Sequence, residues 1–423
     1  MALAAQNTEP MLAGFAPKPV SGWGNEARKN AMATLNKSGA PMRRDEYWKF
    51  TNPATLLSEN PVAAQLVTDE SPVFDSFDKL LIVFKDGIYQ PDLSDDLSGE
   101  NLEIQTLADA MATDIHWAKD IFGVLESRGQ LPVSRPFAAL NTALAEQGFV
   151  LRATGKVSKP VAFRYIRSEN AAQAMIHHVI KLDKAAELTV FENGPGAARI
   201  NTVMEIDVAD NANFHHIRAQ GRDHERQAIT HMFGVLGEES VFRSFTLTVN
   251  GKMTRNEAVL EFTGDNAKAT VAGACVGDGD FHHDDTIFVT HDAVNCESRQ
   301  VFKKVLRNGA VGVFQGKILV KADAQKTDGY QISQALLIDD DAVFLAKPEL
   351  EIYADDVICS HGSTCGATDE TAMFYLMSRG IAKKQAQDLL VLAFLDEAIQ
   401  EVDNEALADE IRKRLAGWTE RHG

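Results

Sequence analysis

The spacing of apolar residues predicts helices at both ends of the chain. Residues 25–37 and 107–126 carry apolar side chains three and four positions apart, which places them on one face of a helix. Between these stretches, the apolar run 80–84 precedes Lys85-Asp86-Gly87, and we expect a strand that enters a tight turn. Helical spacing returns at Asp369, with helices expected as far as Arg379-Gly380, over 382–400 and over 406–418.

A turn, a small residue and a strand recur through the middle of the chain. The small residues Ala185, Ala212, Ser240, Ala267 and Ala293 are 27, 28, 27 and 26 positions apart. Such a period is typical of a solenoid, in which each coil returns the chain one strand spacing further along. The turns at 308–310 and 340–342 break the period, as terminal coils often do.

An antiparallel sandwich with evenly spaced hairpins is the alternative explanation of this period. We favour a parallel β-helix because, apart from Asn250-Gly251, no strand pair is joined by a two-residue Asn-Gly turn with matched flanks. The fold class is therefore mainly β. Residues 1–150 are expected to form a mainly helical region, residues 151–366 the β-helix core, and residues 367–423 a second helical region.

Composition narrows the classes of function. The 423 residues include 60 Asp and Glu against 42 Lys and Arg, a formal net charge of −18 that disfavours binding to nucleic acid. No apolar run is long enough to predict a membrane span, and the first residues lack the pattern of a secretion signal. The four cysteines form no Cys-x-x-Cys pair, which favours the reducing cytoplasm.

Cysteine and histidine residues gather after the predicted strands, in the segment Asp355-Asp356-Val357-Ile358-Cys359-Ser360-His361-Gly362. We expect His361 in a turn beside Gly362, where an imidazole can bind a transition metal or relay protons. Residues two apart in a strand point to one face, so Cys359 and His361 could converge on iron or zinc. Cys365 could add a third ligand. The alternative is a histidine that only makes hydrogen bonds in a loop.

A second cluster comprises His282-His283-Asp284-Asp285 and His291. It could form a cupin-like metalloenzyme site, to which only one of the two adjacent histidines could contribute. Asp284 and Asp285 could instead serve a secreted type of β-helix enzyme that acts on carbohydrate. We favour turn and surface polar residues on a solenoid. The pairs His177-His178 and His215-His216 are each expected to have one buried and one exposed ring.

Several segments, in this order, carry a family resemblance. They include Glu46-Tyr47-Trp48-Lys49-Phe50-Thr51 within 41–51, then 137–143, 312–318, 326–331, 347–352, the Cys359-Ser360-His361-Gly362 motif, and 374–381. The series resembles the SufB/SufD family, the scaffold proteins of the SUF system for iron–sulfur cluster assembly. The lone histidine of the Cys-Ser-His-Gly motif is similar to the SufD branch. Near 331–337, where the SufB branch has a cysteine, this chain has Ile332-Ser333-Gln334-Ala335.

The resemblance implies a right-handed parallel β-helix and a non-enzymatic scaffold. Its partners would be a SufB-like scaffold and a SufC-like ABC ATPase, with a homodimer as a further possibility. The need for an ATPase agrees with the absence of a Walker A or Gly-x-Gly-x-x-Gly sequence here.

The resemblance also implies the site residues. His361 would contribute to a cluster-assembly or iron site shared with the SufB-like partner, and Cys359 is a weaker candidate. The ATPase would dock on the C-terminal helical region, at Phe374, Tyr375, Leu376 and Arg379. We expect no cofactor bound tightly to the isolated chain. The complex would hold a transient iron–sulfur cluster or iron, and flavin is compatible with the family.

Overall fold

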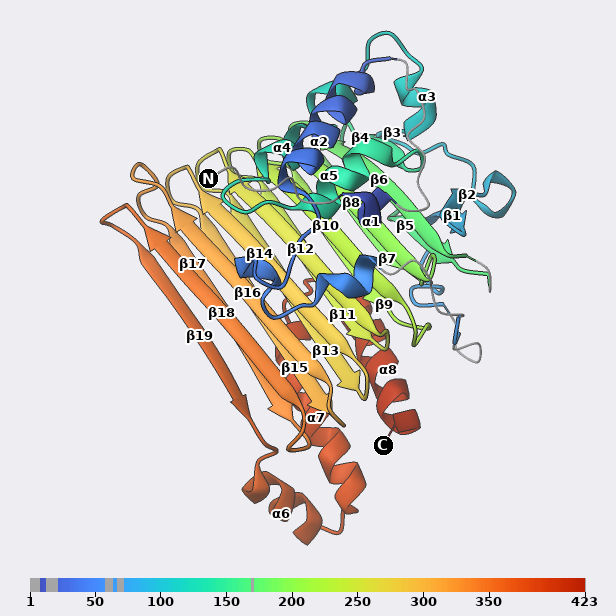
Figure 1. Ribbon diagram of the computed structural model, residues 1–423. Coiled ribbons are helices and arrows are strands. Elements are labelled where there is room, and N and C mark those ends of the chain that lie inside the picture. The colour runs from blue at the N-terminus through green and yellow to red at the C-terminus, as the bar shows by residue number, and fades with distance from the viewer. Residues whose placement is uncertain (1–7, 13–21, 58–63, 67–71, 169–170, 423) are drawn as a thin grey trace.

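The fold is a two-sided solenoid of long parallel strands with helices packed against its outer faces (Figure 1). The computed structural model describes residues 8–12, 22–57, 64–66, 72–168 and 171–422. From β4 to β19, successive strands alternate between a ten-stranded and a nine-stranded sheet. Neighbouring core strands within each sheet are parallel, as Gln227↔Arg199 through Leu236↔Val208 illustrates. The predicted parallel β-helix is thus confirmed, and the antiparallel sandwich is excluded.

Each sheet has two end strands, and each end strand has a neighbour on only one side. In sheet order, the ten-stranded sheet contains β19 (Ile358–Gly366), β17 (Asp328–Leu337), β15 (Glu297–Arg307), β13 (Lys268–Asp278), β11 (Val241–Val249), β9 (Asn213–Gln220), β7 (Glu187–Asn193), β5 (Val161–Ile166), β1 (Leu80–Lys85) and β2 (Ile88–Tyr89). The nine-stranded sheet contains β18 (Val343–Ile352), β16 (Val311–Val320), β14 (His282–His291), β12 (Met253–Phe262), β10 (Gln227–Leu236), β8 (Arg199–Val208), β6 (Gln173–Leu182), β4 (Phe149–Ala153) and β3 (Leu102–Thr106). We call β18 and β19 together the open end.

Left-handed residues explain the repeating turns along one corner of the solenoid. Asn211, Glu239, Asn266 and Asn295 have φ between 54° and 61°. Each precedes a small residue that is buried at the corner, namely Ala212, Ser240, Ala267 and Cys296. Asparagine tolerates this backbone region better than most residues, which accounts for the composition of the turns.

Three details of the predicted period are wrong. The first inward-facing small residue is Ala186 rather than Ala185, because Ala185 itself adopts a φ of 58°. The last is Cys296 rather than Ala293, because the left-handed residue of this turn is Asn295. The turns at 308–310 and 340–342 do not break the period either. They lie on the opposite corner, where the chain passes from the ten-stranded to the nine-stranded sheet.

The N-terminal helices cover the outer face of the nine-stranded sheet. Phe137 and Leu140 of α5 belong to one buried cluster with Met175, Ile229 and Met253 of that sheet. The helical elements are α1 (Glu9–Leu12), α2 (Gly24–Ser38), η1 (Glu46–Trp48), η2 (Pro53–Leu57), η3 (Pro91–Leu93), α3 (Leu107–Met111), η4 (Trp117–Asp120), α4 (Val124–Arg128) and α5 (Pro136–Leu144). The helix predicted over 25–37 and the strand predicted over 80–84 are confirmed as α2 and β1.

The single helix expected over 107–126 is wrong. The segment is divided into α3, η4 and the beginning of α4. Gly123 has a φ of 69° and starts α4, so the chain changes direction inside the apolar pattern. Most of its apolar residues nevertheless share one buried cluster, because the three short elements turn them toward the same patch of sheet, whereas Ile115 is exposed.

The last two C-terminal helices cover the outer face of the ten-stranded sheet. Leu395 of α7 and Leu415 of α8 pack with Ala272, Val301 and Val305. The three helices are α6 (Glu370–Ser378), α7 (Lys383–Ile399) and α8 (Glu405–His422), in agreement with the predicted pattern. Two ion pairs add polar contacts to β15. Lys303 of β15 pairs with Glu397 of α7, and Arg299 of β15 pairs with Glu401, which lies just after α7. Among the helices that the structure describes, none has the length and apolar character to cross a membrane.

A buried histidine inside the solenoid leads to a testable pH dependence. His178 is fully buried, stacks on Phe163 with ring centroids 3.9 Å apart, and lies 3.1 Å from the Tyr165 hydroxyl. Burial lowers the pKa of His178 to about 3. In acid, the unfolded chain therefore binds a proton at His178 that the folded chain does not bind. The contribution of His178 to the free energy of unfolding is fully present above pH 6.5 and is lost as the pH falls.

We expect the His178→Phe variant to lose stability less steeply in acid than the parent chain. The difference in slope should be about 1.4 kcal/mol per pH unit below pH 6. Urea unfolding at pH 7, 6 and 5 measures it, and the slope is insensitive to any constant loss of stability in the variant. Parallel curves for the two proteins would contradict a neutral, buried His178.

Candidate functional site

His361 lies in the middle of β19, the last strand of the ten-stranded sheet. The predicted turn at His361 is wrong, because β19 runs from Ile358 through Gly366 without interruption. His361 is in register with Gln331 of β17, and Ser363 is in register with Ser333. Since Gln331 and Ser333 are fully buried inside the solenoid, His361 belongs to the row of β19 residues on the inward side. Most of this row is exposed, because no further coil of the described part of the chain covers it, and only Cys359 is half-buried.

The backbone of β19 is paired on one side only. Ile358 donates its N–H to the Thr327 carbonyl over 2.8 Å, so alternate residues from Ile358 onward bond to β17. The N–H and C=O groups of Cys359, His361, Ser363 and Cys365 therefore face away from β17, along the free edge. Unpaired edges of this kind are templates for another strand.

The other strand of the open end, β18, is less suited to pairing at its centre. Val343 and Tyr353 donate their N–H groups to Ala310 and Val320 of the preceding coil. By alternation, the even-numbered residues of β18 face the free edge, and Pro348 is one of them. Because proline has no N–H, the free edge of β18 lacks a donor at its middle. Pairing with another chain is consequently favoured at β19.

The three predicted ligands of the Cys-x-His-x3-Cys set do not converge. An extended strand advances about 3.3 Å per residue, so Cys359 and Cys365 are about 20 Å apart. Within the part of the chain that the structure describes, no group of three or more His, Cys, Asp or Glu is arranged to hold a metal ion. Cys365 is therefore excluded from a site with Cys359.

Cys359 and His361 remain together as a pair on one face of β19. Cys359 lies over Gly329, where an added Cβ would be 3.2 Å from its sulfur. The glycine leaves room for the thiol at the mouth of the solenoid. Burial raises the pKa of Cys359, so this thiol is not activated as a nucleophile.

Helix α6 lies beyond the ends of the strands (Figure 1). Several of its apolar side chains are exposed to solvent. Phe374 is 73% exposed and Tyr375 57% exposed, and no residue of the helix is buried. Leu376 is half-buried, and the Arg379 guanidinium lies 5.1 Å from the centre of the Tyr375 ring. The Asp369 side chain accepts hydrogen bonds from Thr371 and Ala372, which fixes the start of the helix. A well-formed helix with an uncovered aromatic face is typical of a binding surface.

The second histidine cluster is buried rather than on the surface, which corrects our interpretation. His283, Asp284, Asp285 and His291 all lie in β14 and are buried. Asp284 faces outward beneath the N-terminal segment, whereas His283, Asp285 and His291 face the interior. The adjacent carboxylates thus lie on opposite faces of the strand, and neither lines a groove for carbohydrate.

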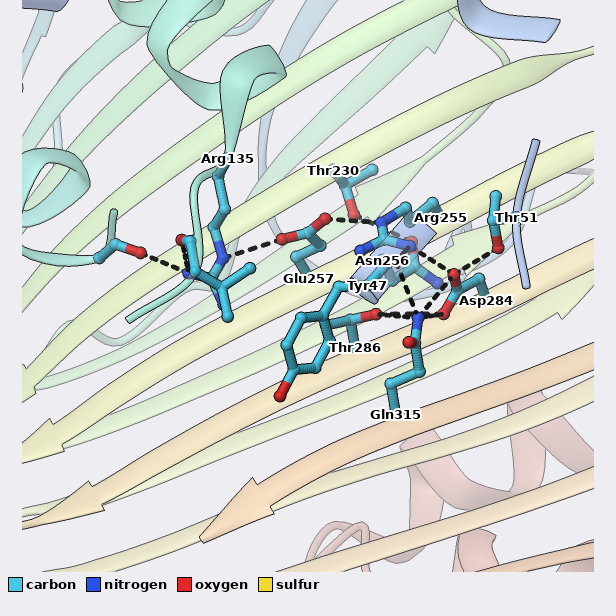
Figure 2. Close-up of polar contacts among 12 residues, drawn as sticks. Tyr47, Thr51, Arg135, Thr230, Arg255, Asn256, Glu257, Asp284, Thr286 and Gln315 are labelled. Atoms are coloured by element: carbon cyan, nitrogen blue, oxygen red, sulfur yellow. Dashed lines mark hydrogen bonds and ion pairs between the residues drawn. The ribbon is translucent and has the colours of Figure 1, made fainter. Parts of the chain in front are cut away.

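On the outward face, Asp284 is the centre of a charged network that holds the N-terminal segment (Figure 2). Its Oδ2 accepts hydrogen bonds from Thr51 and from Arg255 Nη1, each 2.5 Å long. Arg255 also donates to the Tyr47 carbonyl over 2.8 Å and lies 4.2 Å from the Trp48 ring centre. Burial would raise the pKa of Glu257, but Arg255 and Arg135 hold the pKa at about 2, so Glu257 is ionised.

On the inward face, Lys304 contacts the imidazole and the carboxylate that a metal ion would need as ligands. Its ammonium contacts His283 Nδ1 at 2.8 Å and donates to Asp285 over 2.5 Å. His291 lies eight residues further along the strand and bonds to Ser298. These contacts do not support a cupin-like site, because a cation already fills the place between the histidine and the carboxylate.

The paired histidines differ from the prediction at one of two positions. His177 and His178 are both fully buried, because the N-terminal helices cover the outward ring while the solenoid interior encloses the other. His216 is buried and bonds to Glu192 and Ser244, whereas His215 is only half-buried. None of these histidines is at the open end.

Sequence reasoning missed that the N-terminal segment reaches the open end. Glu46 accepts a hydrogen bond of 2.6 Å from Lys347 of β18, and the Tyr47 hydroxyl donates to Glu349. The Lys347 ammonium lies 3.9 Å from the Tyr47 ring centre. The 41–51 and 347–352 segments, noted separately in the sequence, are therefore parts of one contact.

Comparison with known proteins agrees with this architecture. A family model described as "SUF system FeS cluster assembly, SufBD core domain" matches residues 164–394, more than half of the chain. The chain is 28% identical to the iron–sulfur cluster assembly protein SufD of Escherichia coli, over 90% of each chain. It is 26% identical to an iron–sulfur cluster assembly SufBD family protein of Synechocystis, over 91% of this chain and 89% of the relative. SufD of Bacillus subtilis is 25% identical, over 88% and 87%.

Proposed function

Because the chain belongs to the SufBD family of iron–sulfur cluster assembly proteins, we propose that it is a non-enzymatic scaffold subunit of a cytoplasmic SufBCD-type complex. The observation that carries this proposal is the free edge of strand β19, with His361 near the middle of the strand. Its partners would be a SufB-like scaffold and a SufC-like ABC ATPase. A flavin in the assembled complex stays a prediction of the family resemblance.

We place the second scaffold on the open end. Its strand would pair with the free N–H and C=O groups of Cys359, His361, Ser363 and Cys365, as in other cases of strand addition. Ile358, which is 75% exposed, would be covered in the same step. The same edge could pair with a second copy of this chain, and the SufB-like partner is favoured because this chain has no cysteine near 331–337 for a cluster of its own.

His361 would then lie at the seam between the two scaffolds. A neutral imidazole is a good ligand for iron, and one ligand from each side allows a cluster to be held and released as the seam opens. Cys359, on the same face and two residues away, is the second candidate from this chain. Iron and sulfide are the cargo of such a site rather than a resident cofactor.

The His361→Ala variant tests this proposal. The chain would be tagged and co-expressed with the SufB-like and SufC-like proteins of its own source, and purified without oxygen. We expect both partners to co-elute with the variant as with the parent chain. The iron–sulfur absorbance should be at least about tenfold lower in the variant, which is the size of effect seen when a metal ligand, or a residue that orients it, is removed. Cys365→Ala, on the same strand and face, is the matched control and should keep the absorbance. Unchanged absorbance in His361→Ala would contradict the site.

The ATPase would dock on α6 through Phe374, Tyr375, Leu376 and Arg379. Phe374→Ser should weaken ATPase binding about 10- to 100-fold, because exposed aromatic anchors contribute about 2 kcal/mol or more to interfaces. The fold should be unaffected, since Phe374 is 73% exposed. Ile115→Ser is the control, because Ile115 is 85% exposed and lies in the N-terminal region. Equal ATPase binding by both variants, measured by calorimetry, would exclude this surface.

A further inference from the structure

Two buried glutamine side chains lie in one row with His361 on the inward side of the ten-stranded sheet. Gln300 of β15, Gln331 of β17 and His361 of β19 occupy consecutive positions in one register row. All three belong to the inward side of their strands. Gln300 and Gln331 are fully buried, and the last position is the exposed histidine.

The amides of these glutamines form a short ladder. Gln331 donates from Nε2 to the Gln300 Oε1 over 2.9 Å. The Oε1 of Gln331 is buried and has no hydrogen-bond partner among the residues that the structure describes. A buried acceptor without a partner costs about 1–3 kcal/mol, so its presence calls for an explanation.

The facing sheet makes room for this arrangement. A Cβ added to Gly316 of β16 would be 2.2 Å from the Gln331 Nε2 and 2.6 Å from its Cδ. Gly316 therefore allows the Gln331 amide to lie flat against the opposite sheet. The Gln331 amide fills the space in which a side chain at position 316 would lie, and it has little freedom to rotate there.

The direction of the free acceptor follows from amide geometry. Oxygen and nitrogen of a primary amide lie on opposite sides of the Cγ–Cδ axis. Since the nitrogen of the Gln331 amide points toward β15, its oxygen faces β19. His361 is the residue of β19 in register with Gln331.

We propose that Gln331 is the positioning residue for His361, an inference that rests on the proposed function of that histidine. When a partner strand covers β19, one ring N–H of His361 donates to the Gln331 Oε1. That bond fixes the tautomer and the plane of the ring, and the lone pair of the other nitrogen faces the iron. Buried acceptors that orient a ligating histidine typically change metal affinity about 10- to 100-fold.

Two substitutions of opposite character test this role in the anaerobically purified complex. Gln331→Leu fits an apolar interior but has no acceptor. Gln331→Glu keeps an acceptor for His361, and Gln300 can turn its unpartnered Nε2 toward the new carboxylate. We expect the iron–sulfur absorbance per complex to fall about tenfold in Gln331→Leu and to stay within about twofold of the parent in Gln331→Glu. A residue that only fills space predicts the reverse order.

Three further variants separate the possible failures. Gly316→Ala pushes the Gln331 amide aside and should lower the absorbance with both side chains intact, which covers the case that Gln331→Leu does not fold. The double variant His361→Ala with Gln331→Leu should be no lower than His361→Ala alone. Equal losses in Gln331→Leu and Gln331→Glu would overturn the positioning role and leave His361 in place. Unchanged absorbance in His361→Ala would overturn the proposed function and this inference with it.

Discussion

Replacing Asp284 with alanine is expected to lower the free energy of unfolding by about 3–5 kcal/mol, the usual cost of removing one partner from a buried ion pair. The Arg255 guanidinium would lose its 2.5 Å contact with Asp284 while only 1% of its side chain is exposed to water. Thr51 and Gln315 would each lose an acceptor as well. The network would no longer hold Tyr47–Thr51 against the sheet, so local loosening of the N-terminal segment should accompany the global loss.

Urea unfolding of Asp284→Ala and Asp292→Ala measures this effect. Asp292 is the matched control because its ion pair with Lys321, at 2.6 Å, is partly open to solvent. A surface pair of this kind contributes at most about 1 kcal/mol. Similar midpoints for the two variants would mean that the buried network does not anchor the N-terminal segment.

Replacing Ser363 with proline is expected to abolish co-elution with the SufB-like scaffold and leave the isolated chain folded. The Ser363 N–H faces the free edge of β19, so the ring of proline removes a donor that only an incoming strand would use. The ring also occupies the space of that strand. We expect an affinity at least about 100-fold weaker, equivalent to about 2.7 kcal/mol.

Two controls accompany the Ser363→Pro variant. Ser363→Ala removes the 3.1 Å hydroxyl contact with Ser333 and should keep the partner. Thr364→Pro places the same ring on the side that bonds to β17 and should lower thermal stability instead. Co-elution of the Ser363→Pro chain at the parent level would exclude β19 as the interface.

The solenoid was predictable because its turns are local. Each turn combines a left-handed residue with a small residue directly after it, so adjacent positions of the sequence identify the turn. Asn211-Ala212 and Asn266-Ala267 are examples. The error at Ala185 arose because an alanine takes the left-handed position of that turn. The error at Ala293 arose because this second small residue precedes the Asn295-Cys296 pair in its turn. The break of the 107–126 helix escaped prediction because Gly123 interrupts an apolar pattern that continues across it.

The candidate site was only partly predictable. The sequence identifies His361 and Cys359 as chemical groups, but it does not tell that β19 is the last strand and that its edge is free. The buried state of His283, Asp284 and Asp285 was also missed, because a polar run in one sequence does not reveal that Lys304 and Arg255 from neighbouring strands neutralise it. Contacts of this kind depend on the register between adjacent coils.

Hydrogen exchange at single-residue resolution tests the central claim, that a second scaffold pairs with β19. The free chain and its complex with the SufB-like protein would be compared over residues 357–366. We predict slower exchange in the complex at Cys359, His361, Ser363 and Cys365, whose N–H groups face the free edge. The alternating residues that already bond to β17 should change little. A stable complex in which the exchange of these four amides is unchanged would contradict the account.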